Sequence, residues 1–117
     1  MTDGERLGRA NRLARAADVR RCLARGRRRR SEHLEMIWAD NLTGHPRMGL
    51  IVPKYGTSAV ARNRLRRQLR EIWRRDVLPQ SPAWDLVIRA RREAYGQPFG
   101  ELRRQVAAWR DAVTPER

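Results

Sequence analysis

Lysine, cysteine and long apolar runs are nearly absent from this sequence, and each absence excludes a class of protein. Lys54 is the only lysine and Cys22 the only cysteine among 117 residues. A lone cysteine cannot form an internal disulfide, which excludes a disulfide-stapled secreted domain. No apolar stretch approaches the roughly 18 residues of a transmembrane helix, and residues 1–19 lack the apolar segment of a secretory signal. We therefore expect a cytoplasmic protein with no membrane partner.

Catalytic motifs are equally scarce. The two histidines, His33 and His45, stand alone, and neither has metal-ligand spacing to Cys22. Cys22 belongs to an apolar helical pattern, which favours a core thiol over a nucleophile. Phosphate-binding glycine-rich loops, serine-nucleophile motifs and clustered carboxylates are also missing. The sequence predicts a chain with no metal ion, no cofactor and no catalytic residue of its own.

Arginine is what the sequence has in excess. Lys and Arg total 27 against 13 Asp and Glu, which gives a net charge of +14, and all but one of the basic residues are arginine. Such unbalanced charge repels itself in a compact chain, so we expect it to meet a polyanion, with nucleic acid the leading candidate. Guanidinium groups bind phosphate bidentately and stack on bases. Hydrophobic residues at 40% and four tryptophans argue against a disordered basic tail.

The hydrophobic periodicity predicts one α+β domain over residues 12–113. Residues 1–11 are polar and are expected to form a flexible basic arm, and residues 114–117 a tail. Apolar runs bounded by turn residues predict three strands, at 33–39, 47–52 and 85–90. The turn formers within 41–46 favour a hairpin between the first two of these strands.

Three helices are predicted around the sheet. The first runs from residue 18 to a stop at Gly26. The second runs from about residue 59 to 75 with Thr57 or Ser58 as its N-cap, and the third follows Pro98. Helical spacing predicts that the second and third helices bury Leu65, Leu69, Ile72, Trp73, Phe99, Leu102, Val106, Trp109 and Val113. The predicted architecture is a sheet with helices packed on it.

The second predicted helix has an arginine-rich face. It carries seven arginines between Arg62 and Arg75, and Glu71 is its only acid. On a helical wheel, the acid-free face contains Asn63, Arg66, Arg67, Arg70 and Arg74. Like charges four residues apart destabilise an isolated helix, so this pattern favours phosphate binding over a structural role. Glu71 lies just beyond the face, where we expect it to pair with Arg67 or Arg75.

A second basic cluster contains seven arginines in eleven residues and no acid, namely Arg20, Arg21, Arg25 and Arg27–Arg30. The run of four arginines at its end predicts a solvated turn, a sheet edge or an RNA contact. Two separated basic clusters favour a long or folded polyanion.

Trp84 falls in a predicted loop and is a candidate for stacking on a base, the alternative being a core position. The other candidates for the core are Trp38, Trp73 and Trp109.

The segment Ala59–Glu71, AVARNRLRRQLRE, resembles the signature of the bacterial ribonuclease P protein component. Further segments resemble that family in the same order: Arg12 and Leu13, Asp18, Gly26, Arg47–Val52, Lys54–Val60, Asp85–Arg91, Phe99 and Leu102. The resemblance covers about residues 9–113. It implies an α-β-β-β-α-β-α order with a single four-stranded sheet and about three helices. It also implies a ribosomal-protein-like fold with an unusual left-handed βαβ crossover.

The resemblance further implies a function. Such proteins bind a catalytic RNA in a 1:1 complex as a monomer and assist it in removing the 5′ leader of precursor tRNA. The chain would then be a subunit of an endoribonuclease whose chemistry and Mg²⁺ belong to the RNA. Together with the helical wheel, the family pattern gives as RNA-binding residues Lys54, Arg62, Asn63, Arg64, Arg66, Arg67, Arg70 and Arg74. The residues implied for the leader cleft are Arg12, Val19, Leu23, Ile37 and Tyr55.

Two alternatives remain open. Val19, Leu23 and Ile37 are aliphatic at positions where the family commonly has aromatic residues, and aromatic rings are what stack on bases. This departure favours a non-catalytic RNA-binding or ribosome-binding protein of the same fold. A sequence-specific DNA-binding helix is the other alternative, although no helix-turn-helix spacing surrounds residues 62–75.

Overall fold

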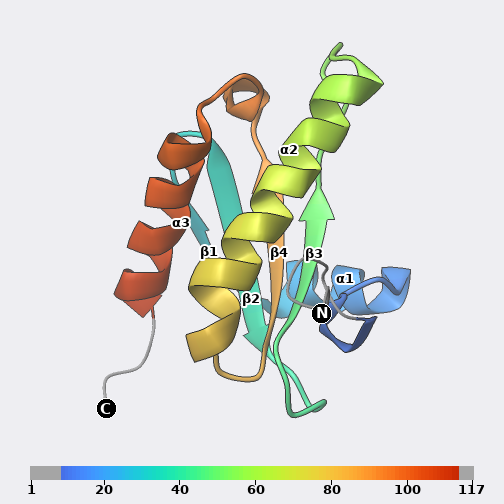
Figure 1. Cartoon of the computed structure of the whole chain (residues 1–117). Coiled ribbons are helices and arrows are strands. Elements are labelled where there is room, and N and C mark those ends of the chain that lie inside the picture. Colours follow the sequence, from blue (N-terminus) through green and yellow to red (C-terminus); the bar gives the residue numbers. More distant parts are fainter. Residues whose placement is uncertain (1–8, 114–117) are drawn as a thin grey trace.

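The computed structural model, which describes residues 9–113, consists of a four-stranded sheet with helices on both faces (Figure 1). The strands are β1 (Arg27–Arg30), β2 (Leu34–Asp40), β3 (Arg47–Ile51) and β4 (Trp84–Ala90). The α-helices are α1 (Ala16–Arg25), α2 (Ala59–Ile72) and α3 (Phe99–Val113). This order confirms the predicted α+β fold with three helices. None of the helices within the described residues has the length and apolar composition that crossing a bilayer requires.

The predicted N-terminal arm and C-terminal tail fall largely outside the described residues, which exclude 1–8 and 114–117. The last three residues predicted for the arm instead form a 3-10 helix, η2 (Arg9–Asn11). The Asn11 side chain donates a hydrogen bond to the Pro46 carbonyl oxygen at 2.8 Å. This contact ties the start of the domain to the loop before β3.

The strand order, β1-β2-β4-β3, shows that the predicted hairpin is wrong. β4 lies between β2 and β3, pairing antiparallel with the first and parallel with the second. The turn formers connect β2 to β3 as predicted, but they do not decide which strands pair. β4 takes the central position because Leu86 and Ile88 face one core while Val87 faces the other. The four arginines of β1 form an exposed sheet edge.

The connection from β3 through α2 to β4 is left-handed. In Figure 1, α2 lies in front of the sheet, both strands point upward, and the chain passes from β3 on the right to β4 on its left. About 98% of such crossovers are right-handed, so the general rule predicts the opposite hand here. The hand implied by the family resemblance is confirmed.

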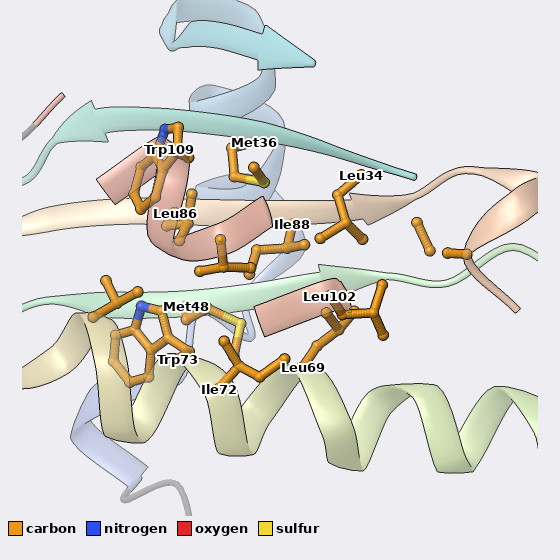
Figure 2. Close-up of a cluster of buried hydrophobic side chains, with 14 of the residues drawn as sticks. Leu34, Met36, Met48, Leu69, Ile72, Trp73, Leu86, Ile88, Leu102 and Trp109 are labelled. Atoms are coloured by element: carbon orange, nitrogen blue, oxygen red, sulfur yellow. The ribbon is translucent and has the colours of Figure 1, made fainter. Parts of the chain in front are cut away.

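The larger core fills the space between the sheet and the helices α2 and α3 (Figure 2). All the apolar positions predicted for the two helices pack in or against it. Three of its four tryptophans, Trp38, Trp84 and Trp109, have ring centroids 5.5 to 6.4 Å apart. Trp84 is buried as the first residue of β4, so the predicted loop position is wrong and the core position is the correct one of the two alternatives.

A smaller core lies on the other face of the sheet, beneath α1. It contains Leu13, Cys22, Ile37 and Val87, all buried. Gly26 ends α1 as predicted, but with a φ of −75° the reason is close approach rather than backbone freedom. A β-carbon on Gly26 would lie 2.6 Å from the Cys22 carbonyl oxygen and 2.8 Å from a methyl group of Ile37. Glycine therefore lets α1 lie directly on β2.

Candidate nucleic-acid interface

α2 is positioned by its cap and by its apolar stripe. The Ser58 hydroxyl accepts a hydrogen bond from the Ala61 amide at 3.1 Å, so Ser58 is the N-cap of the two residues predicted, Thr57 and Ser58. Leu65, Leu69 and Ile72 are buried against the sheet. The helix then continues as a π-helical turn, η3 (Trp73–Val77). These contacts orient the opposite, arginine-rich face of α2 away from the core.

Five arginines on α2 have no carboxylate partner within the described residues. This α2 arginine surface consists of Arg62, Arg64, Arg66, Arg67 and Arg70. Two of the five are oriented by neutral groups: Arg62 donates to the Thr57 carbonyl oxygen and Arg66 to the Asn63 side-chain oxygen, each at 3.0 Å. The guanidinium groups are thus positioned without being neutralised. An unneutralised array on a rigid helix is suited to binding several phosphates.

Glu71 explains why the arginine surface ends before the end of α2. Its carboxylate pairs with Arg75, as predicted, but its other partner is Arg74 at 2.7 Å rather than Arg67. The hydrogen bond from Arg74 is the main reason that the pKa of Glu71 is lowered. Arg74 was predicted for the RNA-binding face, and the structure places it half-buried against this carboxylate.

A concave site connects α2 to the N-terminal segment and β3. The cavity has a volume of about 330 Å³ and is lined by Arg12, Leu13, Ala14, Met48, Gly49, Leu50, Arg66 and Arg70. Three of these residues are arginines and none is acidic. Burial, together with repulsion from Arg12 and Arg66, lowers the pKa of Arg70. Three guanidinium groups that repel each other in one cavity are suited to binding an anion such as phosphate.

Only three of the five residues predicted for the leader cleft come together. Val19 and Leu23 of α1 are half-buried and pack on the smaller core, which includes Ile37. Ile37 itself has no exposed surface. Arg12 lines the cavity beside α2, and Tyr55 lies in the turn between β3 and α2, against Tyr95. Only the aliphatic members of the predicted cleft are neighbours.

The second basic cluster is divided between α1 and β1. Arg20, Arg25 and Arg29 are exposed and have no ion-pair partner within residues 9–113. The guanidinium group of Arg27 lies 5.6 Å from the Trp38 ring centroid. Two of the remaining arginines, Arg28 and Arg30, form ion pairs with Glu35. This cluster therefore has fewer free guanidinium groups than its sequence indicates.

Glu35 is a buried carboxylate that sequence reasoning did not single out. Its oxygens lie 3.6 Å from Arg28, 3.7 Å from Arg30 and 3.3 Å from Arg89. The side chain is on the α1 face of β2, between the edge strand and β4. Only the alternation of β2, which puts Glu35 on the same face as Ile37, indicated its position. The three arginines are held as a group on the sheet surface.

The cysteine and His45 are held by contacts within the fold. Cys22 is buried, and burial raises the pKa of its thiol to about 11, so the thiol is protonated near neutral pH. His45 lies between the carbonyl oxygens of Thr43 and Ala10. Within residues 9–113, no group of three His, Cys, Asp or Glu side chains is placed to hold a metal ion.

The sequence matches known proteins over most of its length. The family model described as Ribonuclease P matches residues 7–113. The ribonuclease P protein component of Thermus thermophilus is 38% identical over 84 residues, which are 72% of this chain and 48% of that protein. The corresponding protein of Mycobacterium tuberculosis is 36% identical over 80 residues, 68% of this chain and 69% of that one. The chain spans about half to two thirds of the length of the curated relatives it matches.

Solved structures show the same fold. The ribonuclease P protein of Staphylococcus aureus superimposes with a TM-score of 0.81 at 23% identity, covering 89% of this chain and 96% of that one. The protein from Thermotoga maritima gives a TM-score of 0.78 at 22% identity, with 89% and 98% covered. At these identities the likeness concerns the fold alone. The family model covers the whole domain, and on that ground this chain belongs to the ribonuclease P protein family.

Proposed function

We propose that this chain is the protein subunit of ribonuclease P, an endoribonuclease that removes the 5′ leader of precursor tRNA. In this role it binds the catalytic RNA as a monomer in a 1:1 complex in the cytoplasm. The observation that carries the proposal is the α2 arginine surface, which is free of acid and continues into the cavity with Arg12. Family membership indicates which polyanion this surface meets.

The geometry suits the backbone of a folded RNA. Each guanidinium group can hold one phosphate through two parallel hydrogen bonds, and Arg66 and Arg70 are adjacent on one side of α2. Arg12 lines the same cavity and would supply a third donor to that anion. Such contacts release counterions, so the affinity is expected to fall steeply with salt.

The division of labour follows from what the side chains can do. The described residues bind and orient RNA, while the proposal assigns bond cleavage and Mg²⁺ to the RNA subunit. Precursor tRNA is proposed to approach the α1 side of the sheet, where Arg20 and Arg25 are exposed and have no ion-pair partner within residues 9–113. Its single-stranded leader would pass over Val19 and Leu23, which are half-buried and aliphatic.

Reconstitution tests the proposal directly. The chain is combined with a bacterial ribonuclease P RNA at low Mg²⁺, and cleavage of precursor tRNA is compared with that of the RNA alone. We expect faster cleavage and tighter binding of precursor tRNA. Cleavage no faster than with RNA alone would rule out the proposed function.

The aliphatic contact between α1 and the sheet, formed by Val19, Leu23 and Ile37 and called here the α1 groove, favours one second candidate, a non-catalytic RNA-binding or ribosome-binding protein of the same fold. Because Ile37 is fully buried and its neighbours are aliphatic, the groove offers little surface for stacking bases. The two functions differ in leader dependence. Only a ribonuclease P subunit should make its complex with the RNA bind precursor tRNA more tightly than mature tRNA, which a filter-binding comparison measures.

A further inference from the structure

Tyr55 has a backbone conformation that disfavours tyrosine. Its φ is 44°, and it is the only non-glycine residue with a positive φ in the described part of the chain. The next residue, Gly56, also has a positive φ, of 76°. Glycine adopts this region without a steric penalty, whereas a residue with a β-carbon is strained there. A tyrosine at this position therefore lowers the stability of the fold. A role other than stabilising the fold is needed to explain why the residue is a tyrosine.

The Tyr55 ring is held in place and remains accessible. Its centroid lies 6.3 Å from that of Tyr95, with the ring planes at 81°. Tyr95 is anchored, because its hydroxyl donates to the Pro53 carbonyl oxygen and its ring packs against the larger core. The guanidinium carbon of Arg92 lies 4.8 Å from the Tyr55 centroid. Tyr55 is nevertheless 39% exposed, as an edge-on contact and one stacked cation leave part of the ring open.

The surroundings of this ring are cationic. Lys54 precedes it and is exposed, and neither Lys54 nor Arg92 has an ion-pair partner within residues 9–113. The Tyr55 hydroxyl forms no hydrogen bond to any residue of the described region, so the ring and not its polar tip makes the contacts. A rigid aromatic ring next to a stacked guanidinium group and a free ammonium group matches a flat base joined to a phosphate.

We propose that Tyr55 and Arg92 form a stacking platform for an unpaired base of single-stranded RNA. The platform rests on the proposed RNA-binding function but is separate from the α1 groove. It lies beyond the C-terminal end of β4, since Arg92 follows that strand. α1 is held toward the other end of the sheet, where Asp18 pairs with Arg47 at the start of β3 (Figure 1). The platform therefore takes a base that the groove does not contact.

Fluorescence of a base analogue tests the platform. A short single-stranded oligoribonucleotide with one 2-aminopurine is titrated with the full chain, and stacking on Tyr55 should quench its emission. Tyr55→Gly is expected to lose the quenching and to bind about five-fold or more weakly, the effect of removing one stacked base. Tyr55→Phe keeps the ring and should bind within two-fold of the parent. Tyr55→Arg adds a charge without a ring and should also lose the quenching.

Thermal unfolding separates binding from folding. Because glycine relieves the strain at φ 44°, Tyr55→Gly should unfold at a temperature no lower than the parent chain. Unchanged quenching and affinity in both Tyr55→Gly and Tyr55→Arg would overturn the platform. A Tyr55→Gly chain that unfolds well below the parent would overturn it too, because the ring would then be retained for the fold.

The proposed function has a separate outcome. If the parent chain quenches the oligoribonucleotide but does not stimulate precursor cleavage, the ribonuclease P assignment fails and the platform stands. If it stimulates cleavage while both ring-deleting variants still quench, only the platform fails.

Discussion

The arginines of α2 and α3 differ in what neutralises them. Every arginine of α3 contacts a carboxylate, in the pairs Arg103–Asp76, Arg104–Glu101, Arg104–Glu32 and Arg110–Asp111. The five arginines of the α2 arginine surface contact none within residues 9–113. The same residue type therefore has two uses in one small domain. On α3 it joins elements of the fold, and on α2 it has no internal carboxylate, as the proposed binding of RNA requires.

The largest expected effect follows from removing charge on the α2 side. Arg66→Ala with Arg70→Ala takes two guanidinium groups from the cavity that also contains Arg12. We expect affinity for ribonuclease P RNA to fall at least ten-fold near physiological salt. The slope of log K against log salt should flatten by about 1.5, which corresponds to two phosphates. Filter binding over a range of salt concentrations measures both quantities.

The control removes the same number of charges from the other helix. Arg103→Ala with Arg104→Ala should leave the affinity within about two-fold and the salt slope nearly unchanged, with binding measured where both chains are folded. If both double variants reduce the RNA affinity and flatten the salt slope by the same amounts, net charge rather than the α2 arginine surface governs RNA binding.

The next effect concerns stability and belongs to the α3 side. Asp76 accepts two hydrogen bonds from Arg103, at 2.7 and 2.9 Å, and its own side chain is largely buried at the end of η3. Asp76→Ala removes the link from η3 to α3. We expect a loss of about 1 kcal/mol in the free energy of unfolding, limited because Arg103 is about half exposed. RNA affinity should not change, and urea unfolding together with filter binding tests both expectations.

The pH dependence of stability should also come from the paired arginines. Hydrogen bonds from Arg104 and then Gln105 lower the pKa of Glu101 from 4.5 to about 2. A carboxyl group whose pKa is lower in the folded state stabilises the fold above its unfolded pKa, and this contribution is lost as the pH falls from about 4.5 toward 2. A carboxyl titration followed by NMR should give Glu101 a pKa well below that of exposed glutamates. Glu101→Gln should make unfolding less dependent on pH in this range, and an ordinary pKa would contradict the pairing.

The same contrast shows how much of the molecule could be predicted from sequence. The apolar stripe and Ser58 cap of α2 were correctly predicted because both are local, since a 3.6-residue period and an N-cap are written within a few residues. The strand that pairs with β3 was not correctly predicted, because a turn signal in 41–46 carries no information about which strand becomes central. The left-handed crossover required a family resemblance, since general rules favour the other hand.

The candidate site divides along the same line. The arginine face of α2 was predictable by helical geometry, except that Arg74 is turned toward Glu71. Arg12 was assigned to a different surface, since its position beside Arg66 depends on the pairing of the N-terminal segment alongside β3. The group formed by Glu35 and its arginines was missed because its members come from three separate strands, β1, β2 and β4. Contacts within one helix were predictable, whereas contacts among distant segments were not.

The smallest expected effect comes from making α2 resemble α3. Asn63→Glu places a carboxylate three and four residues before Arg66 and Arg67, in the orientation that favours an ion pair on a helix. We expect the free protein to gain a few tenths of a kcal/mol in stability, although the hydrogen bond from Arg66 to the Asn63 side chain is replaced. RNA affinity should fall at the same time, since the new carboxylate neutralises guanidinium groups and repels phosphate. Asn63→Gln, which adds length without charge, should do neither. Opposite changes in stability and affinity from one residue would show that the α2 arginine surface lacks acids because it binds RNA, whereas a parallel rise in both would contradict the distinction between the two helices.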